Sequence, residues 1–234
     1  MSSHHEVPEI LYEDNHLLVV NKRVSDIVQG DKTGDISLDR MLKNYISEKY
    51  QKPGEAFLGV VHRIDRPVSG VVIFSRTSKS LSRMNQFFKD GKVQKTYWAI
   101  VKNLPPDTEG LLSHFLVRDP KKNKSFAFDH EVKGAKKALL SYKVIHEFDN
   151  YYLLEIDLKT GRHHQIRSQL AKIACPIKGD LKYGFPRSNP DGGISLHAFK
   201  VVFPHPVKDE MISVEALPPS DILWDAYCKK IGLY

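Results

Sequence analysis

The sequence is poor in the residues that build disulfide frameworks and metal sites. Only two cysteines, Cys175 and Cys228, occur among 234 residues, too few for such a framework or for a four-cysteine zinc site. No hydrophobic run reaches the length of a membrane helix, and Met1–Ile10 has no apolar core of the kind found in secretion signals. The composition predicts a cytoplasmic protein, not bound to a membrane, that folds without metal or disulfide.

Several nucleotide-binding and hydrolase motifs are also missing. The sequence contains neither the Gly-x-Ser-x-Gly turn of serine hydrolases nor the Gly-x-Gly-x-x-Gly turn of dinucleotide-binding proteins. Gly30-Asp31-Lys32-Thr33 lacks the glycine that precedes lysine in a phosphate-binding P-loop. These absences argue against common hydrolases and against nucleotide-dependent enzymes.

Basic residues, in contrast, are in excess. Lysine and arginine number 35 against 28 acidic residues, which gives a formal net charge of +7 and a sequence pI near 9.2. A basic surface favours a polyanionic partner, most often nucleic acid. Charge alone is weak evidence, so the motifs must decide.

Hydrophobic patterns predict more strands than helices. Two antiparallel hairpins are expected, one around the Asp149-Asn150 turn and one between Leu196–Phe203 and Met211–Ala216. Further strands are predicted at His16–Lys22, Gly70–Ser75 and Thr96–Val101. The order is not an alternation of strands and helices, so we predict an α+β fold with a mixed, largely antiparallel sheet.

Three helices are predicted from capping residues and apolar spacing. The first begins after Ser37 and ends at Pro53-Gly54, the second begins after Ser78, and the last follows Pro218-Pro219-Ser220. The first has Leu38, Met41, Leu42, Tyr45 and Ile46 on one face, and the second has Leu81, Met84, Phe87 and Phe88 inward. The last carries Ile222, Leu223, Tyr227 and Ile231. The segment 105–137 has little pattern and fits either a functional excursion or a solvated loop.

Three segments carry candidate chemistry. In His62–Gly70, Asp65 stands between two arginines just before a predicted strand, and functional groups are commonly placed on such turns. Leu158–Arg167 holds two arginines and two histidines, which suit phosphate or carboxylate contacts better than metal binding. In Lys95–Val101, strand alternation places Tyr97 on one face, where it could stack on a base. The residues alone also fit a surface salt bridge, a basic turn feeding a helix, and a core tyrosine.

The three segments together resemble the RluA-type pseudouridine synthases. The family pattern His-Arg-Leu-Asp-x-x-Thr-Ser-Gly aligns with His62–Gly70, Lys-x-Tyr with Lys95–Tyr97, and Thr-Gly-Arg-Thr-His-Gln-Ile-Arg with Thr160–Arg167. Further similar segments lie at 10–14, 19–22, 176–184 and 196–198. The resemblance implies a single catalytic domain over residues 1–234, without the N-terminal S4-type RNA-binding domain of some relatives.

The chain departs from the family pattern at a few positions. Ile64 replaces leucine, and Val68 and His163 each replace threonine. Arg23 stands where proline is usual, and Ser25-Asp26 replaces a small residue followed by glycine. The last two changes concern the conformation of the first loop and not the reacting groups.

The resemblance implies an RNA isomerase that needs no cofactor and no metal. Asp65 would be the catalytic carboxylate, as nucleophile at ribose C1′ or as base at C2′, and the sequence does not choose between these roles. Arg167 would keep Asp65 ionised, and Tyr97 would stack on the flipped uracil. The expected substrate contacts are His62, Arg63, Arg162, His164, Gln165 and Leu196. The expected partner is structured RNA, rRNA or tRNA, with no DNA, and a monomer is expected.

Two other classes of protein remain as alternatives. An RNA-binding protein without activity would not need Asp65. A nucleoside hydrolase would use two carboxylates, for which the motif segments supply Asp65 and, as a distant candidate, Asp180.

Overall fold

The computed structural model describes residues 6–30, 34–51 and 53–233. Residues 31–33 of the rejected P-loop candidate and the first five residues of the chain therefore lie outside it. The described chain divides into two compact units, both discontinuous in sequence. Unit 1 comprises residues 1–93 and 199–217, and unit 2 comprises residues 94–198 and 218–234. A single catalytic domain over the whole chain stays a prediction.

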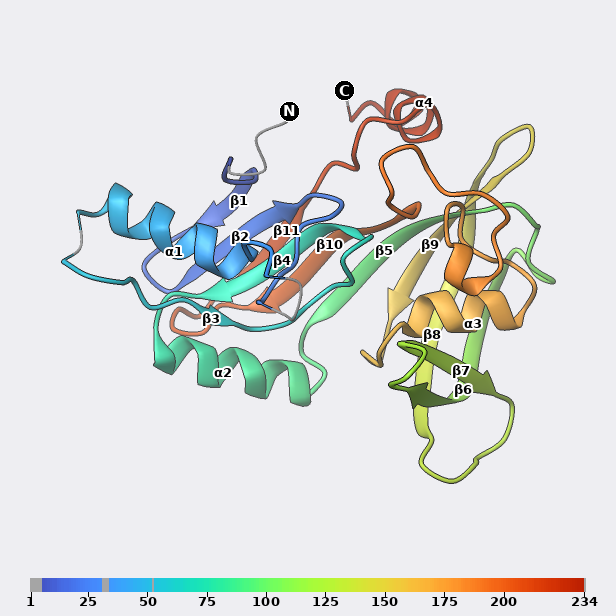
Figure 1. The fold of residues 1–234 in the computed structure, drawn as a ribbon, viewed down its shortest axis with the longest axis horizontal. Helices are drawn as coiled ribbons and strands as arrows, with labels where there is room; N and C mark the ends of the chain where they lie inside the picture. Colours follow the sequence, from blue (N-terminus) through green and yellow to red (C-terminus); the bar gives the residue numbers. More distant parts are fainter. Residues whose placement is uncertain (1–5, 31–33, 52, 234) are drawn as a thin grey trace. The chain divides into compact units, whose positions relative to one another are not determined.

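Unit 1 is built on a sheet in the order β1-β2-β4-β10, with β11 on β10 and the short β3 on β4 (Figure 1). Its elements are β1 (Ile10–Glu13), β2 (Leu17–Lys22), α1 (Leu38–Lys49), β3 (Gly59–Val60), β4 (Ser69–Ser75), α2 (Ser78–Lys89), β11 (Met211–Glu215) and most of β10 (Leu196–Pro204). The strands pair antiparallel in β1–β2, β2–β4, β3–β4 and β10–β11. The predicted hairpin near the C-terminus is thereby confirmed.

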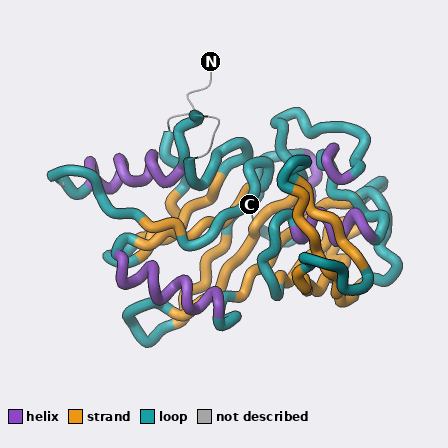
Figure 2. Tube along the Cα trace, turned by 60° about the horizontal axis from the view of Figure 1, so that its bottom comes forward, coloured by secondary structure: helices purple, strands orange, loops and turns teal. Residues whose placement is uncertain are grey.

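Each face of the unit 1 sheet has its own apolar cluster. Leu17, Val19, Val71 and Ile73 pack with Met84 of α2, whereas the alternating residues Leu18, Val20, Val72 and Phe74 pack with α1 through Leu38, Met41, Leu42 and Ile46. The strands run between these two helices in the tube view (Figure 2). Because β2 and β4 are covered on both faces, their sequences read as continuous hydrophobic runs.

The predicted helices of unit 1 exist, with corrected ends. α1 ends at Lys49, before Pro53-Gly54, and Gln51 then adopts a left-handed φ of 46°. α2 is capped by Thr77 and not by Ser78, since the Thr77 hydroxyl accepts a hydrogen bond from the Ser80 N–H. Both corrections are small, because the apolar spacing fixes the helix face more tightly than its ends.

Unit 2 carries a sheet in the order β5-β9-β8-β6-β7 (Figure 1). Its elements are β5 (Gln94–Val101), β6 (Glu109–Asp119), β7 (Lys124–Phe128), β8 (Lys136–Glu147), β9 (Tyr152–Leu158), α3 (Gln165–Lys172), a 3₁₀ turn (Leu181–Tyr183) and α4 (Ile222–Lys230). β8 and β9 form the hairpin predicted around Asp149-Asn150, where the Phe148 N–H donates to the Tyr151 carbonyl at 2.8 Å. The predicted α+β fold with a largely antiparallel sheet is confirmed.

The segment 105–137, for which the sequence leaves open a functional excursion or a solvated loop, has regular structure. This segment contains β6, β7 and the start of β8, joined in antiparallel ladders. β6 gives no clean alternation signal because most of its residues are only partly buried and Leu111 points outward, 62% exposed. The hydrophobic pattern of a half-covered strand is too weak to predict it.

α4 covers part of one sheet face of unit 2 through aromatic residues. Trp98 stacks on Trp224 and meets Tyr227 edge-to-face, with ring centroids 6.5 and 5.3 Å apart. The predicted helix is present, but its inward face is Trp224, Tyr227 and Cys228, and Ile222 is 86% exposed.

Candidate active site

Asp65 lies in the loop between β3 and β4 of unit 1, as predicted. The Val68 N–H donates to the Asp65 carbonyl at 3.0 Å, which closes a turn over Asp65-Arg66-Pro67-Val68. The Asp65 side chain is partly exposed, and Arg63 of the same loop is exposed. An aspartate on a short turn ahead of a fully buried strand is well placed to act on a bound molecule.

A buried lysine stabilises this turn through hydrogen bonds to main-chain carbonyls. Lys22, at the end of β2, is fully buried, and its Nζ donates to the carbonyls of Arg23, Asp26 and Arg66 at 2.8, 2.8 and 3.1 Å. Three acceptors match the three N–H donors of an ammonium. Burial nevertheless lowers the pKa of Lys22 to about 7, against the opposing effect of Asp26 and Asp65. This role of Lys22 was not predicted from the sequence, because its acceptors are main-chain carbonyls, one of them 44 positions away.

The departures in the first loop form part of the same arrangement. Ser25 has a left-handed φ of 74°, and its N–H donates to the Arg66 carbonyl at 3.1 Å. Arg23 forms an ion pair with Asp26 at 3.2 Å. The loop therefore reaches the Asp65 turn without the usual proline and glycine, at the cost of one strained serine.

His62 supports the turn from the side. Its Nε2 accepts a hydrogen bond from the Ile73 N–H at 3.1 Å, and its ring stacks on Phe88 of α2 with centroids 5.2 Å apart. These contacts join the Asp65 loop to β4 and α2. A role in substrate contact, expected from the motif, stays a prediction.

Tyr97 lies on β5 in unit 2, opposite Ile156 of β9, and is 8% exposed. Pairing continues from Ile156 to Tyr142 on β8, so these three residues form one row across the sheet. The next strand, β6, offers His114 on the same face, where its Nδ1 lies 3.0 Å from Nε2 of Gln169. Tyr97 is therefore on the face of the sheet that α3 covers.

The segment Thr160–Arg167 forms a turn that feeds α3. Gln165 organises it: its Oε1 accepts from the Thr160 hydroxyl at 2.7 Å and from the Arg162 N–H at 3.0 Å, and its Nε2 donates to the Leu139 carbonyl at 3.1 Å. His164 precedes the helix with a left-handed φ of 51°. Arg162 is exposed, and its Nε donates to the Lys137 carbonyl at 3.1 Å.

Arg167 forms a buried, bidentate ion pair with Asp180. Nε donates to Oδ2 at 2.7 Å and Nη2 donates to Oδ1 at 2.9 Å, with the two side chains 5% and 1% exposed. The guanidinium also lies over the ring of Tyr183, 5.1 Å from its centroid. Asp180, the distant candidate for a second hydrolytic carboxylate, is thus a buried partner of Arg167. Sequence analysis did not foresee this pair.

The remaining predicted contacts differ in exposure. Gln165 and His164 are buried within the turn, and Leu196, 4% exposed, is buried at the start of β10. Arg63 and Arg162 are the two predicted contact residues that present charge to solvent. Asp65 belongs to unit 1, whereas Tyr97 and Arg167 belong to unit 2. Their meeting in one active site stays a prediction.

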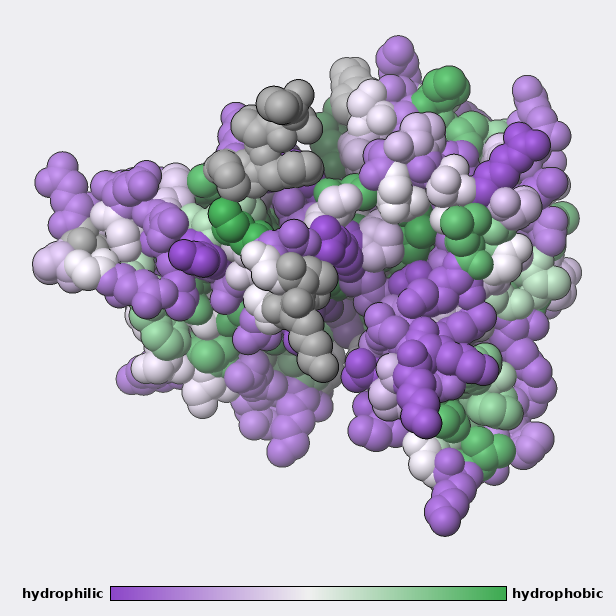
Figure 3. All heavy atoms as spheres, in the orientation of Figure 1, coloured by the Kyte–Doolittle hydropathy of each residue, from purple (hydrophilic) through white to green (hydrophobic). Residues whose placement is uncertain are grey.

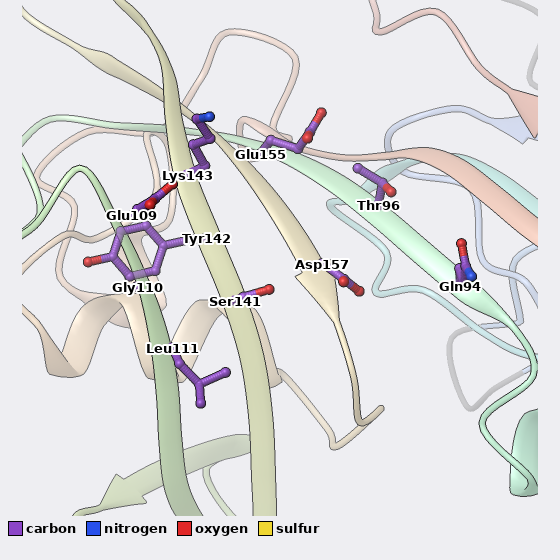
Figure 4. Close-up of a pocket in the computed structure, with 10 residues that line it drawn as sticks. All are labelled: Gln94, Thr96, Glu109, Gly110, Leu111, Ser141, Tyr142, Lys143, Glu155 and Asp157. Carbon is purple, nitrogen blue, oxygen red and sulfur yellow. The ribbon is translucent and has the colours of Figure 1, made fainter.

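An open hollow of about 640 Å³ lies on the other sheet face of unit 2. Figure 4 shows polar side chains of β5, β9, β8 and β6 around it, among them Thr96, Asp157 and Ser141, which pair across neighbouring strands. Thr96 adjoins Tyr97 on β5, so alternation directs the two side chains to opposite faces. The hollow is therefore not the Tyr97 site.

Within residues 6–30, 34–51 and 53–233, no cluster of histidine, cysteine or acidic residues is arranged to hold a metal ion. None of the helices in that same part of the chain is long and apolar enough to span a membrane.

Solved structures of two human proteins have the same fold as this chain. The structure of human RNA pseudouridylate synthase domain containing 4 superposes with a TM-score of 0.78 at 22% identity, covering 94% of this chain and 92% of that chain. Human RNA pseudouridylate synthase domain containing 1 gives 0.75 at the same identity, covering 97% and 89%. At this identity the likeness shows the fold alone.

Sequence comparison identifies the family. The profile of RNA pseudouridylate synthases matches residues 16–172. The chain is 32% identical to the uncharacterised RNA pseudouridine synthase YhcT of Bacillus subtilis, over 92% of this chain and 70% of that protein. It is also 32% identical to the ribosomal large subunit pseudouridine synthase C of Buchnera aphidicola, over 95% and 70%. The chain belongs to the RNA pseudouridylate synthase family, in its RluA-type branch. It is an isomerase that converts uridine to pseudouridine in RNA.

Proposed function

We propose that this enzyme modifies a uridine in a structured rRNA or tRNA, with Asp65 as the catalytic carboxylate. Relatives named for each substrate class support both options. One is the Buchnera enzyme, and another is the tRNA pseudouridine synthase C of Pectobacterium carotovorum, 29% identical over 93% of this chain and 59% of that protein. Flipping the uridine out of its stack costs a few kcal/mol, least in a loop.

The observation that carries the proposal is the way in which the Asp65 turn is held. Lys22, Ser25 and the Asp65–Val68 hydrogen bond all fix main-chain atoms of this turn. The Asp65 carboxylate is left partly exposed on a preorganised support. A catalytic group placed in this way loses little freedom when the ribose binds, which favours the reaction.

Arg167 and Tyr97 complete the proposed site. A guanidinium has five N–H donors, and the Asp180 pair uses two, so one arginine has the capacity to serve a second carboxylate. Its charge would keep Asp65 ionised. Tyr97 would stack on the extruded base. In the reaction, the bond between C1′ and N1 breaks, the uracil turns and C1′ bonds to C5. The C5 proton is lost to water, and the vacated N1 takes up a proton from water.

RNA backbone contacts are proposed for a basic surface of unit 2. Arg63 of unit 1 would contribute a separate contact. The unit 2 surface consists of the cations Lys121, Lys122, Lys124, Lys136, Lys137, Arg162 and Lys182. None of these seven forms an ion pair with a described residue. Hydrophilic side chains dominate the view over α3, and hydrophobic side chains adjoin them near the β6–β7 hairpin (Figure 3). Unneutralised cations suit phosphate, and each phosphate contact contributes about −0.7 to −0.9 to the slope of log affinity against log salt.

The test is turnover by Asp65→Asn on RNA labelled with tritium at uracil C5. Isomerisation replaces the C5–H bond, so tritium released to water counts turnovers. We expect no release above background, with RNA affinity unchanged or higher, because a negative charge near phosphate is removed. The control is Asp90→Asn after α2, whose carboxylate accepts from Gln86 only among the described contacts. Turnover by Asp65→Asn at the parent rate would refute the assignment.

Substrate class is tested by mapping. Pseudouridine positions in rRNA and tRNA would be compared between cells with and without the gene, and the missing position restored by purified enzyme on the matching transcript. If neither rRNA nor tRNA loses a pseudouridine in cells without the gene, the proposed substrates are refuted. Free uracil in the same reactions would instead indicate a hydrolase.

A further inference from the structure

His163 connects two parts of the basic surface of unit 2. It stands where the resembled motif has threonine. Its Nδ1 lies 2.9 Å from the Ser125 hydroxyl and its Nε2 lies 3.2 Å from Oδ1 of Asn123, both in the β6–β7 hairpin. The Ser125 hydroxyl also donates to the His163 carbonyl at 2.7 Å. Side chain and main chain of one residue therefore both bind the hairpin.

The hydrogens in this contact can be assigned. A serine hydroxyl has one proton. Because Ser125 gives it to the His163 carbonyl, the Ser125 oxygen accepts from Nδ1–H. Nε2 then faces the amide of Asn123, which accepts from an imidazolium through its oxygen or donates to a neutral imidazole through its nitrogen. The structure places Oδ1 of Asn123 toward Nε2, which is the arrangement that suits the protonated ring.

His163 and Ser125 are also held by contacts with His164 and Tyr183. The His163 ring stacks on His164, with centroids 3.9 Å apart and planes 17° from parallel. His164 Nδ1 lies 3.0 Å from the Tyr183 hydroxyl, which accepts from the Ser125 N–H at 2.8 Å. Ser125 is 2% exposed. The hairpin tip is thus held by a closed ring of contacts and not by a single hydrogen bond.

The hairpin tip carries the cations of the proposed RNA contact. Lys121 and Lys122 are exposed in the turn between β6 and β7, and Lys124 begins β7. Lys182 donates to the Asn123 carbonyl at 3.0 Å, so a fourth cation meets the same turn. Arg162 directly precedes His163 in the sequence. His163 therefore joins the lysines of the hairpin to the arginine of the motif turn.

We propose that His163 is a positioning residue that sets the hairpin lysines and Arg162 into one preformed phosphate-binding surface. The proposal rests on the proposed RNA contact of this surface. A threonine has one short hydroxyl and cannot reach both Ser125 and Asn123, so the hairpin of this chain is fastened by a contact that the motif threonine does not supply. Ordering the lysines before binding reduces the entropy lost when RNA binds.

The test separates binding from chemistry with His163→Ala and His163→Thr. We expect KM for RNA to rise about 5-fold or more. Each hydrogen bond that is lost should weaken RNA binding about fivefold, and at least one is lost. kcat at saturating RNA should stay within about twofold, because His163 does not touch the reacting atoms. His163→Gln, which retains an amide able to meet Ser125 or Asn123, should recover part of the loss. His130→Ala, an exposed histidine after β7, is the control.

A double-mutant cycle with Ser125→Ala checks the contact itself. The two KM increases should combine to less than their product, because both variants remove the same hydrogen bond. Unchanged KM in His163→Ala, a fall in kcat alone, or strictly multiplicative effects would overturn the proposal. Lys121→Gln with Lys122→Gln and Lys124→Gln tests the surface independently. If this triple variant weakens RNA binding but His163→Ala does not, the His163 role fails and the RNA contact stands; if the triple variant binds normally, the RNA contact itself fails.

Discussion

The two motif segments are stabilised in different ways. The Asp65 turn of unit 1 is held mainly through its main chain, by one buried lysine and two backbone hydrogen bonds. The Thr160–Arg167 turn of unit 2 is held through side chains, by Gln165, His163 and the Arg167–Asp180 pair. Main-chain support tolerates changes of side chain within the turn, whereas side-chain support ties each residue to a specific partner. This contrast predicts that unit 2 is the more sensitive to single substitutions.

The largest effect is expected from breaking the buried pair of unit 2. Asp180→Asn removes the carboxylate that pairs with Arg167, and Arg167→Met removes the guanidinium that pairs with Asp180. Each variant should therefore lower the free energy of unfolding by about 3–5 kcal/mol. The double variant should lose less than the sum of the two, by about 0.5–3 kcal/mol. Urea unfolding of the four proteins measures both quantities. Additive losses would show that the two groups do not stabilise each other.

A smaller and pH-dependent effect is expected from Lys22→Met in unit 1. Three partly buried carbonyls lose their donor, which should cost about 1–3 kcal/mol. The pKa of Lys22 is near 7 in the folded protein and near 10.5 in an unfolded chain. Between these values the unfolded chain binds more protons, so the parent gains stability as pH rises, by at most about 1.4 kcal/mol per pH unit.

The variant lacks this gain, so the parent's advantage over Lys22→Met should grow from pH 7 to pH 9. Guanidinium unfolding at each pH measures the difference, and Lys89→Met, an exposed residue at the end of α2, serves as the control. A difference that stays constant over this range would contradict the lowered pKa.

The smallest effect is expected at Ser25, and it has the opposite sign. Glycine adopts positive φ without strain, so Ser25→Gly should stabilise the protein by up to about 1 kcal/mol. Ser213→Gly in the exposed row of β11 is the matched control and should destabilise by roughly 0.5–1 kcal/mol. Thermal unfolding compares the two. A loss of stability in Ser25→Gly would mean that the serine side chain contributes more than its backbone costs.

The sequence predicted those elements whose pattern is strong in one stretch of chain. The β8–β9 hairpin follows from its Asp149-Asn150 turn, and α1 follows from the spacing of Leu38, Leu42 and Ile46. β6 and β7 were missed because each buries only part of its side chains. Wrong helix limits and the exposed Ile222 arise where tertiary packing, not local pattern, selects the inward face.

The candidate site divides in the same way. Asp65, Tyr97 and Arg167 are predicted as site residues because their motifs are continuous in sequence, and their roles stay predictions. Lys22 was missed as a support, since its three acceptors are carbonyls, which no residue type encodes. The Arg167–Asp180 pair was missed because a long-range ion pair leaves no periodic signal.

The discontinuity of both units has a consequence for synthesis on the ribosome. Unit 1 needs β10 and β11 for its sheet, yet residues 94–198 of unit 2 emerge before them. At about 5–20 residues per second, the edge of β4 that β10 covers waits unpaired for roughly 5–20 s. An apolar strand edge is a template for wrong pairing during that interval. Codon choice and chaperone supply across this stretch should therefore govern the yield of folded enzyme more than they do elsewhere in the gene.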